Sequence, residues 1–227
     1  MRCIALAEWA VALKAKVIVS VLVDAPDLSW PCPMAVGRSD LKAKVAIQDG
    51  GGGMTFAGPS IWRIIDAPPP DLSDPILCDG AGLIYPHFGA FPINGFPTFA
   101  GPQWMPLRRP FSGGSLRGAP ERTNSAVGYR SEGRNVRELR GLPAHEVAAE
   151  LRWAEYAVVP PSTIAYEALA CATPLRLLRV DYPCADIGAA MVDARVAIWD
   201  DEQTQGAFSC PDVIDGLGAK RILEALL

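Results

Sequence analysis

The sequence lacks the patterns of a zinc protein, a disulfide-stapled protein and a membrane protein. Its six cysteines are widely spaced without a CxxC pair, and only two histidines occur in 227 residues, which favours free thiols in a reducing compartment. No uncharged run reaches the roughly 18 residues of a membrane-spanning helix. Glu8, Lys14 and Lys16 interrupt the apolar N-terminal stretch and no small-residue cleavage site follows it, so a leader peptide is not indicated. We expect a cytoplasmic protein with no metal, no cofactor and no membrane contact.

A basic composition is also missing. The net charge of −4 gives the chain as a whole no attraction to nucleic acid. Charge is nevertheless uneven, since residues 108–140 hold eight arginines against three glutamates and residues 181–215 hold eight acidic residues against Arg195. Solvated surface explains both segments better than a binding role. Nucleic-acid binding by the basic segment is not favoured, because few stacking aromatics beyond Tyr129 lie among its arginines.

The first half of the chain predicts one clear helix and strand, and weaker signals after them. Residues 2–14 are rich in helix formers, and residues 17–23 include a β-branched run typical of a buried strand. The four glycines at 50–53 are followed by no Lys-Ser/Thr pair, so a flexible turn is favoured over a phosphate loop. The other predictions here are a faint helix and strand at 39–47, a strand at 61–66, a strand end at 76–79 and a packed irregular segment at 85–111.

The second half alternates more cleanly. Residues 112–134 are rich in Gly, Ser and Arg and suggest a boundary, which divides the chain into a lobe at 1–111, a connection at 112–140 and a lobe at 141–227. Half of the residues are apolar, enough for two small cores. Repeated strand–helix units imply a parallel sheet flanked by helices. The predicted helices are 143–153, 162–171, 185–194 and a final one capped by Asp215 that runs to 226; the predicted strands are 156–159, 175–180 and 196–199.

The stretch 154–174 is the most informative part of the sequence. It predicts a strand, a tight turn and a helix that begins at Ser162 and Thr163. Amides and the positive dipole end at such a helix start can bind a phosphate without a dedicated side chain. Glu167 follows one turn later on the same face, where it can accept hydrogen bonds from sugar hydroxyls. Ser and Thr also act as plain helix caps, so the spacing alone leaves both interpretations open.

Four segments, at 1–8, 98–111, 154–174 and 215–221, follow the order and pattern of a known family. The second resembles a Gly-Pro-x-Tyr-x-x-Leu-Arg-x-x-Phe segment and the last an Asp-Gly-x-Gly-x-x-Arg motif. The chain thereby resembles the UDP-sugar hydrolases of pseudaminic acid biosynthesis, relatives of the GT-B glycosyltransferases. The resemblance implies two Rossmann-like lobes, both abbreviated here, and release of UDP from a diacetamido-trideoxy sugar. It implies four nucleotide-binding residues: Ser162, Thr163, Tyr166 and Glu167.

Departures from the family pattern bear on catalysis. The family's Gly-x-Gly-His loop, which carries its catalytic histidine, would precede Met1. His87 and His145 occupy no matching position, so we interpret them as surface or packing residues and leave the catalytic residues unknown. Prolines at 160–161 replace a Gly-Gly pair and remove N–H donors that would face a diphosphate. Ile-Gly at 187–188 replaces an Asn-Gln pair. We expect a shortened member of the family with impaired hydrolysis.

Two functions of different classes follow. The first is a UDP-sugar-binding protein, an enzyme or former enzyme with an incomplete catalytic apparatus. The second is a non-catalytic structural or interaction subunit that keeps the fold as a scaffold within a larger assembly. The six tryptophans and the Pro-aromatic run at 85–111 suit a protein–protein surface. Core packing explains most of the tryptophans equally well.

Overall fold

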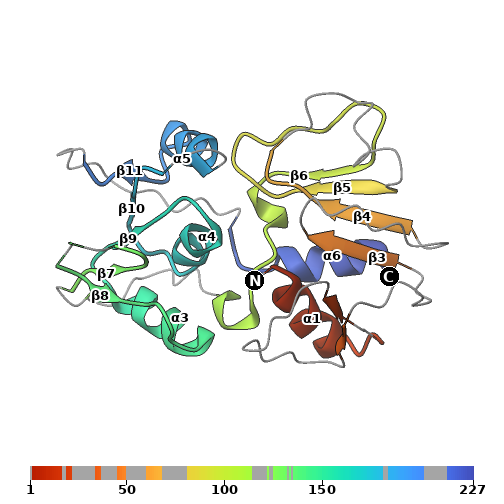
Figure 1. The fold of residues 1–227 in the computed structure, drawn as a ribbon, viewed down its shortest axis with the longest axis horizontal. Helices are drawn as coiled ribbons and strands as arrows, with labels where there is room; N and C mark the ends of the chain where they lie inside the picture. Colours follow the sequence, from red (N-terminus) through yellow and green to blue (C-terminus); the bar gives the residue numbers. More distant parts are fainter. Residues whose placement is uncertain are drawn as a thin grey trace. The chain divides into compact units, whose positions relative to one another are not determined.

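A computed structural model describes residues 2–16, 19–21, 34–36, 45–49, 60–67, 81–113, 122, 125–131, 133, 135–180, 184–201 and 214–227. The chain forms two compact units, which are treated separately: unit 1 comprises Met1–Arg108 and Ala219–Leu227, and unit 2 comprises Arg109–Gly218. Each unit has a parallel sheet flanked by helices (Figure 1). The predicted α/β class is therefore confirmed.

Unit 1 contains a four-stranded parallel sheet in the order β3-β4-β5-β6. Its strands are β3 (Val45–Asp49), β4 (Ser60–Ile64), β5 (Gly82–Tyr85) and β6 (Thr98–Ala100). A separate parallel pair joins β1 (Val19–Val21) and β2 (Met34–Val36). Because these strands run parallel and pair in sequence order, the carboxyl ends of β3, β4 and β5 lie at the same edge of the sheet.

Two helices cover one face of this sheet (Figure 1). They are α1 (Arg2–Ala12) and α6 (Gly218–Leu226). α1 is built from strong helix formers without an internal Gly or Pro. Small Ala side chains on both helices allow a close approach to the branched residues of β4 and β5, and the shared core consists of Ala5, Leu6, Ala10, Ile64, Ile84, Ala219, Ile222 and Leu223. The last helix of the chain thus completes the core of the unit that contains the first.

Aromatic side chains extend this core. The ring of Phe99 stacks between Trp62, at a centroid distance of 4.7 Å, and Trp104, at 4.3 Å. Trp9 donates its indole N–H to the Leu107 carbonyl. The segment predicted as irregular holds β6 and two short 3-10 turns, η1 (Pro102–Trp104) and η2 (Arg109–Phe111). These tryptophans therefore serve packing within the unit.

Unit 2 contains a five-stranded parallel sheet in the order β11-β10-β9-β7-β8. Its strands are β7 (Val127–Gly128), β8 (Arg137–Glu138), β9 (Ala157–Val159), β10 (Leu175–Leu177) and β11 (Ile198–Trp199). Numbered within the unit, this order is 2-1-3-4-5, one of the doubly wound arrangements. β7 and β8, which the sequence analysis did not predict, lie within the Gly- and Arg-rich range 112–140.

Three helices accompany these strands: α3 (Ala144–Trp153), α4 (Thr163–Ala170) and α5 (Cys184–Asp193). Pro143 is the N-cap of α3 and Ser162 the N-cap of α4, so both predicted starts agree with the structure. The α3–α4 pair encloses Thr173, whose buried hydroxyl donates to the Leu151 carbonyl at 2.6 Å. Because the predicted starts of α3 and α4 agree with the structure, unit 2 is the part of the chain that the sequence predicts best.

The Asp-Gly pair at 215–216 has a structural role. The Asp215 carboxylate accepts from the Leu217 N–H at 3.0 Å, and the Asp215 carbonyl accepts from the Gly113 N–H at 3.1 Å. Gly216 has φ +75°, and a Cβ there would lie 2.1 Å from the Phe111 carbonyl oxygen. α6 begins at Gly218, so Asp215 forms a turn ahead of the helix, and the predicted cap was wrong by two residues.

Candidate functional sites

The strand order of unit 2 defines a topological switch point between β7 and β9. Ligands of doubly wound sheets bind at the carboxyl ends of the strands at such a point. Gly128 of β7 pairs with Val158 of β9, and the Tyr129 N–H donates to the Val158 carbonyl at 3.1 Å. The residues that follow the two strands, 129–131 and 160–162, therefore lie at the same edge of the sheet.

Helix α4 begins at this edge. Its N-cap Ser162 is extended, with φ −139° and ψ −169°, and its side chain makes no capping hydrogen bond. The Ala165 N–H bonds to the Ser162 carbonyl, whereas the Thr163 and Ile164 amides, as the first two of the helix, have no intrahelical acceptor. The Ser162 N–H donates to the Pro160 carbonyl at 2.8 Å. The start of α4 thus carries two amides without an intrahelical acceptor and the hydroxyl groups of Ser162 and Thr163.

The other two predicted nucleotide-binding residues lie deeper. Tyr166 is fully buried and Glu167 nearly so, at 6% exposure. Glu167 follows Thr163 by one helical turn, as the spacing predicts, so both rise from the same side of α4. The four predicted residues therefore lie within the six positions from the N-cap Ser162 to Glu167, with the hydroxyl pair outermost.

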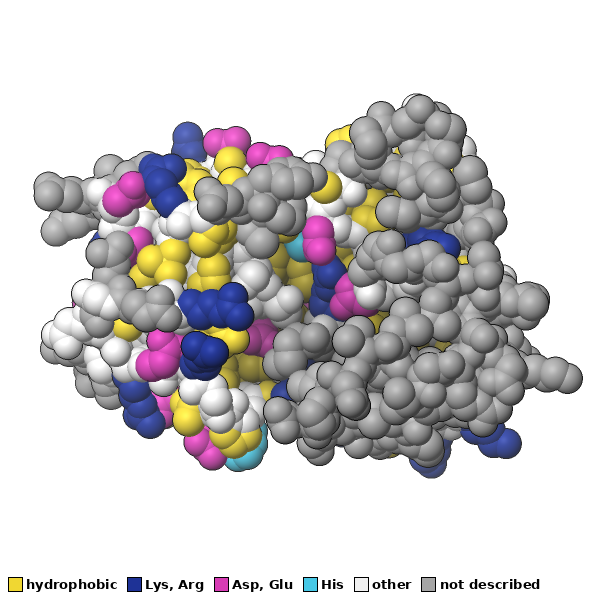
Figure 2. All heavy atoms as spheres, in the orientation of Figure 1, with side chains coloured by type: hydrophobic (Ala, Val, Ile, Leu, Met, Phe, Trp, Pro, Cys, Tyr) yellow, Lys and Arg dark blue, Asp and Glu magenta, His cyan; other side chains and the backbone are white. Residues whose placement is uncertain are grey.

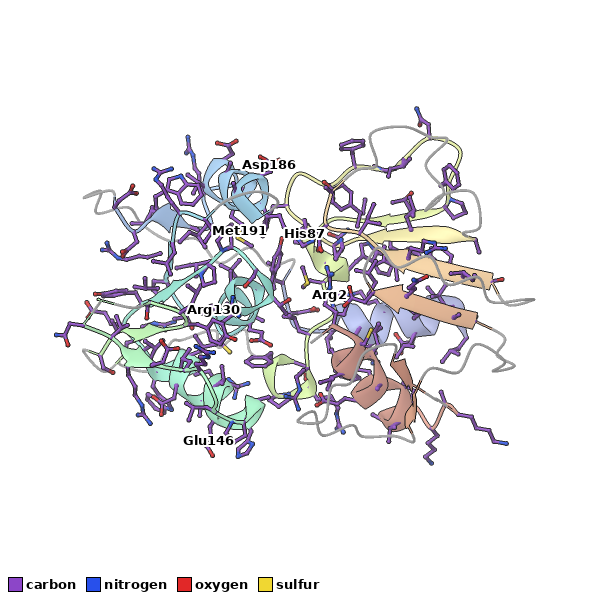
Figure 3. All side chains as sticks on the ribbon, viewed as in Figure 1. Arg2, His87, Arg130, Glu146, Asp186 and Met191 are labelled. Carbon is purple, nitrogen blue, oxygen red and sulfur yellow. The ribbon has the colours of Figure 1, made fainter. Side chains whose placement is uncertain are left out.

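Arg130 is a candidate that the sequence analysis missed, because it lies in the range predicted as a connection. It directly follows β7 and Tyr129, has φ +53° and is exposed. Its N–H donates to the Glu138 carboxylate at 3.3 Å, and its guanidinium lies 5.9 Å from the centre of the Tyr129 ring. Figure 3 labels it in unit 2. A positively charged residue, Arg130, thus lies near the switch point of the sheet.

Pro161 lies close to Gly188 of α5. A Cβ at Gly188 of α5 would lie 3.1 Å from Pro161 Cγ and 2.6 Å from Trp199 Cη2. The Trp199 ring lies 4.5 Å from the Arg179 guanidinium, which pairs with Asp201 at 2.7 Å. Glycine at 188 therefore allows α5 to approach the turn before α4.

The surface of unit 2 shows no separation of charge on the face in Figure 2. Basic and acidic side chains alternate there among the described residues. Two of the basic residues pair with acids: Arg137 with Glu150 at 2.8 Å, and Arg179 with Asp201. Of these two arginines, only Arg137 belongs to the basic segment 108–140.

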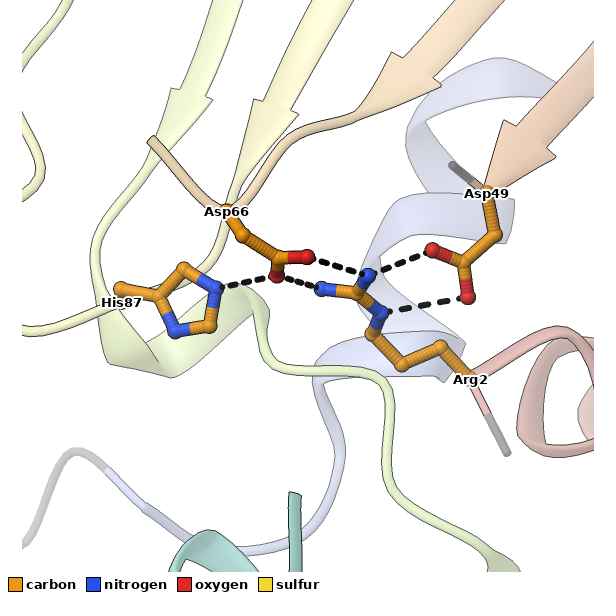
Figure 4. Close-up of polar contacts among 4 residues, drawn as sticks. All are labelled: Arg2, Asp49, Asp66 and His87. Atoms are coloured by element: carbon orange, nitrogen blue, oxygen red, sulfur yellow. Dashed lines mark hydrogen bonds and ion pairs between the residues drawn. The ribbon is translucent and has the colours of Figure 1, made fainter. Parts of the chain in front are cut away.

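Unit 1 carries a polar cluster at the carboxyl ends of β3, β4 and β5, formed by Arg2, Asp49, Asp66 and His87 (Figure 4). Arg2 Nη2 bonds to Asp49 Oδ1 at 2.5 Å and to Asp66 Oδ2 at 3.1 Å. Arg2 Nε bonds to Asp49 Oδ2 at 3.2 Å, and Arg2 Nη1 bonds to Asp66 Oδ1. His87 Nε2 lies 2.9 Å from Asp66 Oδ1. The Arg2 guanidinium thereby links the carboxylates of Asp49 and Asp66 to the start of α1.

Charge states follow from this geometry. Burial opposes ionisation of Asp66, but hydrogen bonds from His87 and Arg2 outweigh it and hold the pKa of the carboxyl well below its usual range. Burial lowers the pKa of His87, and the Asp66 hydrogen bond compensates only in part. Neutral His87 therefore donates its Nε2–H to an ionised Asp66. Burial and the charge of Asp49 raise the pKa of the neighbouring Cys3 thiol to about 11.

The described residues hold no group of three His, Cys, Asp or Glu side chains that could bind a metal. Cys3 and Cys171 form no disulfide, and the other four cysteine side chains lie outside the described part. Within that part, no helix has the length and apolar character needed to cross a membrane. Comparisons with protein-family models, curated proteins and solved structures gave no match.

Proposed function

We propose that the protein binds UDP or a UDP-sugar at the start of α4, with the architecture of two Rossmann-like, GT-B-like lobes. The observation that carries the proposal is the position of Ser162. It caps α4 without a side-chain capping bond, and it follows β9 after two prolines, beside the switch point of the sheet. Helix N-termini at such points are anion sites in doubly wound folds.

Each neighbouring group has a role in this proposal. The Thr163 and Ile164 amides and the Ser162 and Thr163 hydroxyls donate to the diphosphate, and Arg130 supplies the countercharge. Glu167 accepts from the ribose hydroxyls, as the family resemblance implies. Tyr166, which is fully buried, supports the helix start from within the core. The missing N–H donors of the two prolines reduce the number of contacts to phosphate, so we expect moderate affinity.

Hydrolysis is impaired in this proposal. Neither histidine of the given sequence matches the position of the family's catalytic histidine. His145 is a largely exposed residue of α3, whereas His87 is buried and its Nε2 is engaged by Asp66. Loss of a positioned acid or base typically lowers a rate by about 10²–10⁴-fold. We therefore propose nucleotide binding with little or no turnover in the cytoplasm.

Calorimetric titration with UDP tests the proposal. We expect a dissociation constant on the order of 10 μM, weakened about tenfold in Arg130→Gln because a charge-assisted hydrogen bond is lost. Arg140→Gln is the matched control, since Arg140 is also exposed and its N–H also donates to Glu138 Oε1. Ser162→Ala and Glu167→Gln should weaken binding without removing a positive charge.

Absence of heat at millimolar UDP would overturn the proposal. The alternative would then gain support, namely a non-catalytic subunit that uses the fold as a scaffold for protein partners. Equal weakening by Arg130→Gln and Arg140→Gln would contradict the site but not nucleotide binding itself, because a diffuse electrostatic effect would explain it.

A further inference from the structure

The residue two positions after β7 has an uncommon backbone conformation. Arg130 has φ +53°, in the left-handed region that residues with a Cβ adopt infrequently. Such a conformation persists where neighbouring groups fix it, and it is enriched at positions that bind ligands. The groups that hold the Arg130 backbone therefore bear on the proposed nucleotide site.

Backbone hydrogen bonds fix the end of β7 itself. The Tyr129 N–H donates to the Val158 carbonyl of β9 at 3.1 Å, and the Leu139 N–H donates to the Gly128 carbonyl at 2.7 Å. These bonds join β7 to its neighbours on both sides, and they end one residue before Arg130. The conformation of Arg130 therefore needs a further contact.

Glu138 of β8 supplies that contact. It is the residue that pairs with Gly128 of β7. Its Oε1 accepts from the Arg130 N–H at 3.3 Å and from the Arg140 N–H at 3.0 Å. Among the contacts of the described residues, the first of these is the only hydrogen bond to the Arg130 backbone. One carboxylate oxygen thus joins the residues that follow β7 to those that follow β8.

We propose that Glu138 is a positioning residue, which holds Arg130 in the orientation that binds the diphosphate of UDP. The inference rests on the proposed nucleotide site and adds to it a residue of the neighbouring strand. Glu138 bonds to the amide of Arg130, and the Arg130 guanidinium forms no ion pair within the described part of the chain. The guanidinium charge therefore remains for a ligand, while the backbone that carries it is already fixed.

The charge of Glu138, taken alone, opposes an anion site. A carboxylate near a diphosphate weakens binding by repulsion, so removal of its charge should strengthen binding. A positioning role predicts the opposite when the acceptor is removed as well, because the ligand then binds only the fraction of molecules in which Arg130 is oriented. The electrostatic effect and the positioning effect thus differ in sign.

Two variants separate charge from position. Glu138→Gln and Glu138→Ala both remove the negative charge, but only glutamine keeps an oxygen that can accept from the Arg130 N–H. In calorimetric titrations with UDP, we expect the glutamine variant to bind at least as tightly as the wild type and the alanine variant about three- to tenfold more weakly. Glu155→Ala is the control, since Glu155 is also exposed but precedes β9; its affinity should stay within about twofold of the wild type.

The Arg130→Gln background tests whether Glu138 acts through Arg130. There, Glu138→Ala should cause no further weakening, because no guanidinium remains to be positioned. A second readout needs no UDP. The three-bond coupling between the amide and α protons of Arg130 reports φ, and it should change in Glu138→Ala but not in Glu138→Gln. Glu138 is exposed, so both variants should fold; Glu138→Ser takes the place of the alanine variant if that one does not.

Three results would overturn the role of Glu138 and leave UDP binding intact. They are equal affinities of the glutamine and alanine variants, the same weakening by Glu138→Ala with and without the Arg130 guanidinium, and an unchanged Arg130 coupling in Glu138→Ala. Absence of UDP binding by the wild type is a different outcome, because it would overturn the nucleotide site and the positioning role with it.

Discussion

His87 Nε2 and Asp66 Oδ1 lie 2.9 Å apart and join the loops that follow β4 and β5. His87 is neutral in this bond because burial lowers its pKa. Its partner is the most exposed member of the cluster and is also held by Arg2. The stability of unit 1 is therefore linked to pH through a buried imidazole and an ionised carboxylate.

Stability should fall on mild acidification. Because burial holds the pKa of folded-state His87 below its ordinary value of about 6.5, the unfolded chain binds more protons than the folded chain below about pH 6.5. His87 thus contributes its full stability above that pH and loses it as the pH falls toward the folded pKa. Urea unfolding at pH 8.0 and 5.5 should show a lower midpoint at 5.5. His87→Gln should reduce the difference, whereas His145→Gln, at an exposed site, should not.

A second loss should follow at lower pH. The pKa of Asp66 is depressed, so its contribution is present above its unfolded pKa of about 3.9 and is lost as the pH falls through the folded value. The pH profile of Asp66→Asn should be flatter below about pH 4 than that of the wild type. A parallel profile for the variant would show that the cluster does not set the acid limit of stability.

Arg2→Lys should destabilise the protein by about 1–3 kcal/mol, because a lysine cannot bond to Asp49 and Asp66 in the bidentate geometry of Arg2. The control is Arg179→Lys. Arg179 and Asp201 are 57% and 54% exposed, and exposed pairs contribute about 0–1 kcal/mol. Chemical unfolding of both variants measures the contrast, and equal losses would contradict a special role for the cluster.

Gly216→Ala should cost more than about 2 kcal/mol, since it adds a positive-φ penalty to a backbone clash with Phe111. Gly141→Ala provides the comparison. Gly141 has φ +86°, but a Cβ there meets nothing within 4 Å, so only the conformational penalty of about 1 kcal/mol applies. Differential scanning calorimetry should rank the two variants in this order.

Gly188→Ala should destabilise unit 2, even though the helix propensity of alanine is about 1 kcal/mol more favourable than that of glycine. The added methyl group would meet Trp199 and Pro161. Tryptophan fluorescence should change together with stability. In a Trp199→Leu background the ring is absent, so the cost should shrink or change sign, and an unchanged cost there would rule out this contact as its cause.

Local signals in the sequence predicted much of unit 2. Pro143 and the Ser162–Thr163 pair predict the starts of α3 and α4, and short apolar runs predict β9 and β10. The strands β7 and β8 were not predicted, because each has only two residues. Such short strands are stabilised by pairing with other strands of the sheet, which leaves no local pattern in the sequence. Arg130 was consequently assigned to a connection, although it follows a strand.

The cluster of unit 1 was hidden for a different reason. Arg2 and Asp66 are 64 positions apart in the sequence, and Asp49 adjoins a glycine run that predicts a flexible turn and no functional role for its carboxylate. His87 was interpreted as a surface or packing residue, and it is buried. Only the strand order brings these side chains together, so pairwise contacts between distant residues, and not periodicity, determine the site.

The chain leaves unit 1 at Arg108 and returns to it at Ala219. Unit 2 is thus an insertion within unit 1, and the core partners of α1, namely Ala219, Ile222 and Leu223, come after unit 2 in the sequence. The face of the sheet that α6 covers would stay open until α6 has been synthesised, and exposed apolar surface makes a partly folded chain prone to aggregate. We therefore expect unit 2, the inserted unit, to complete its folding in the cell before unit 1, which flanks it in sequence.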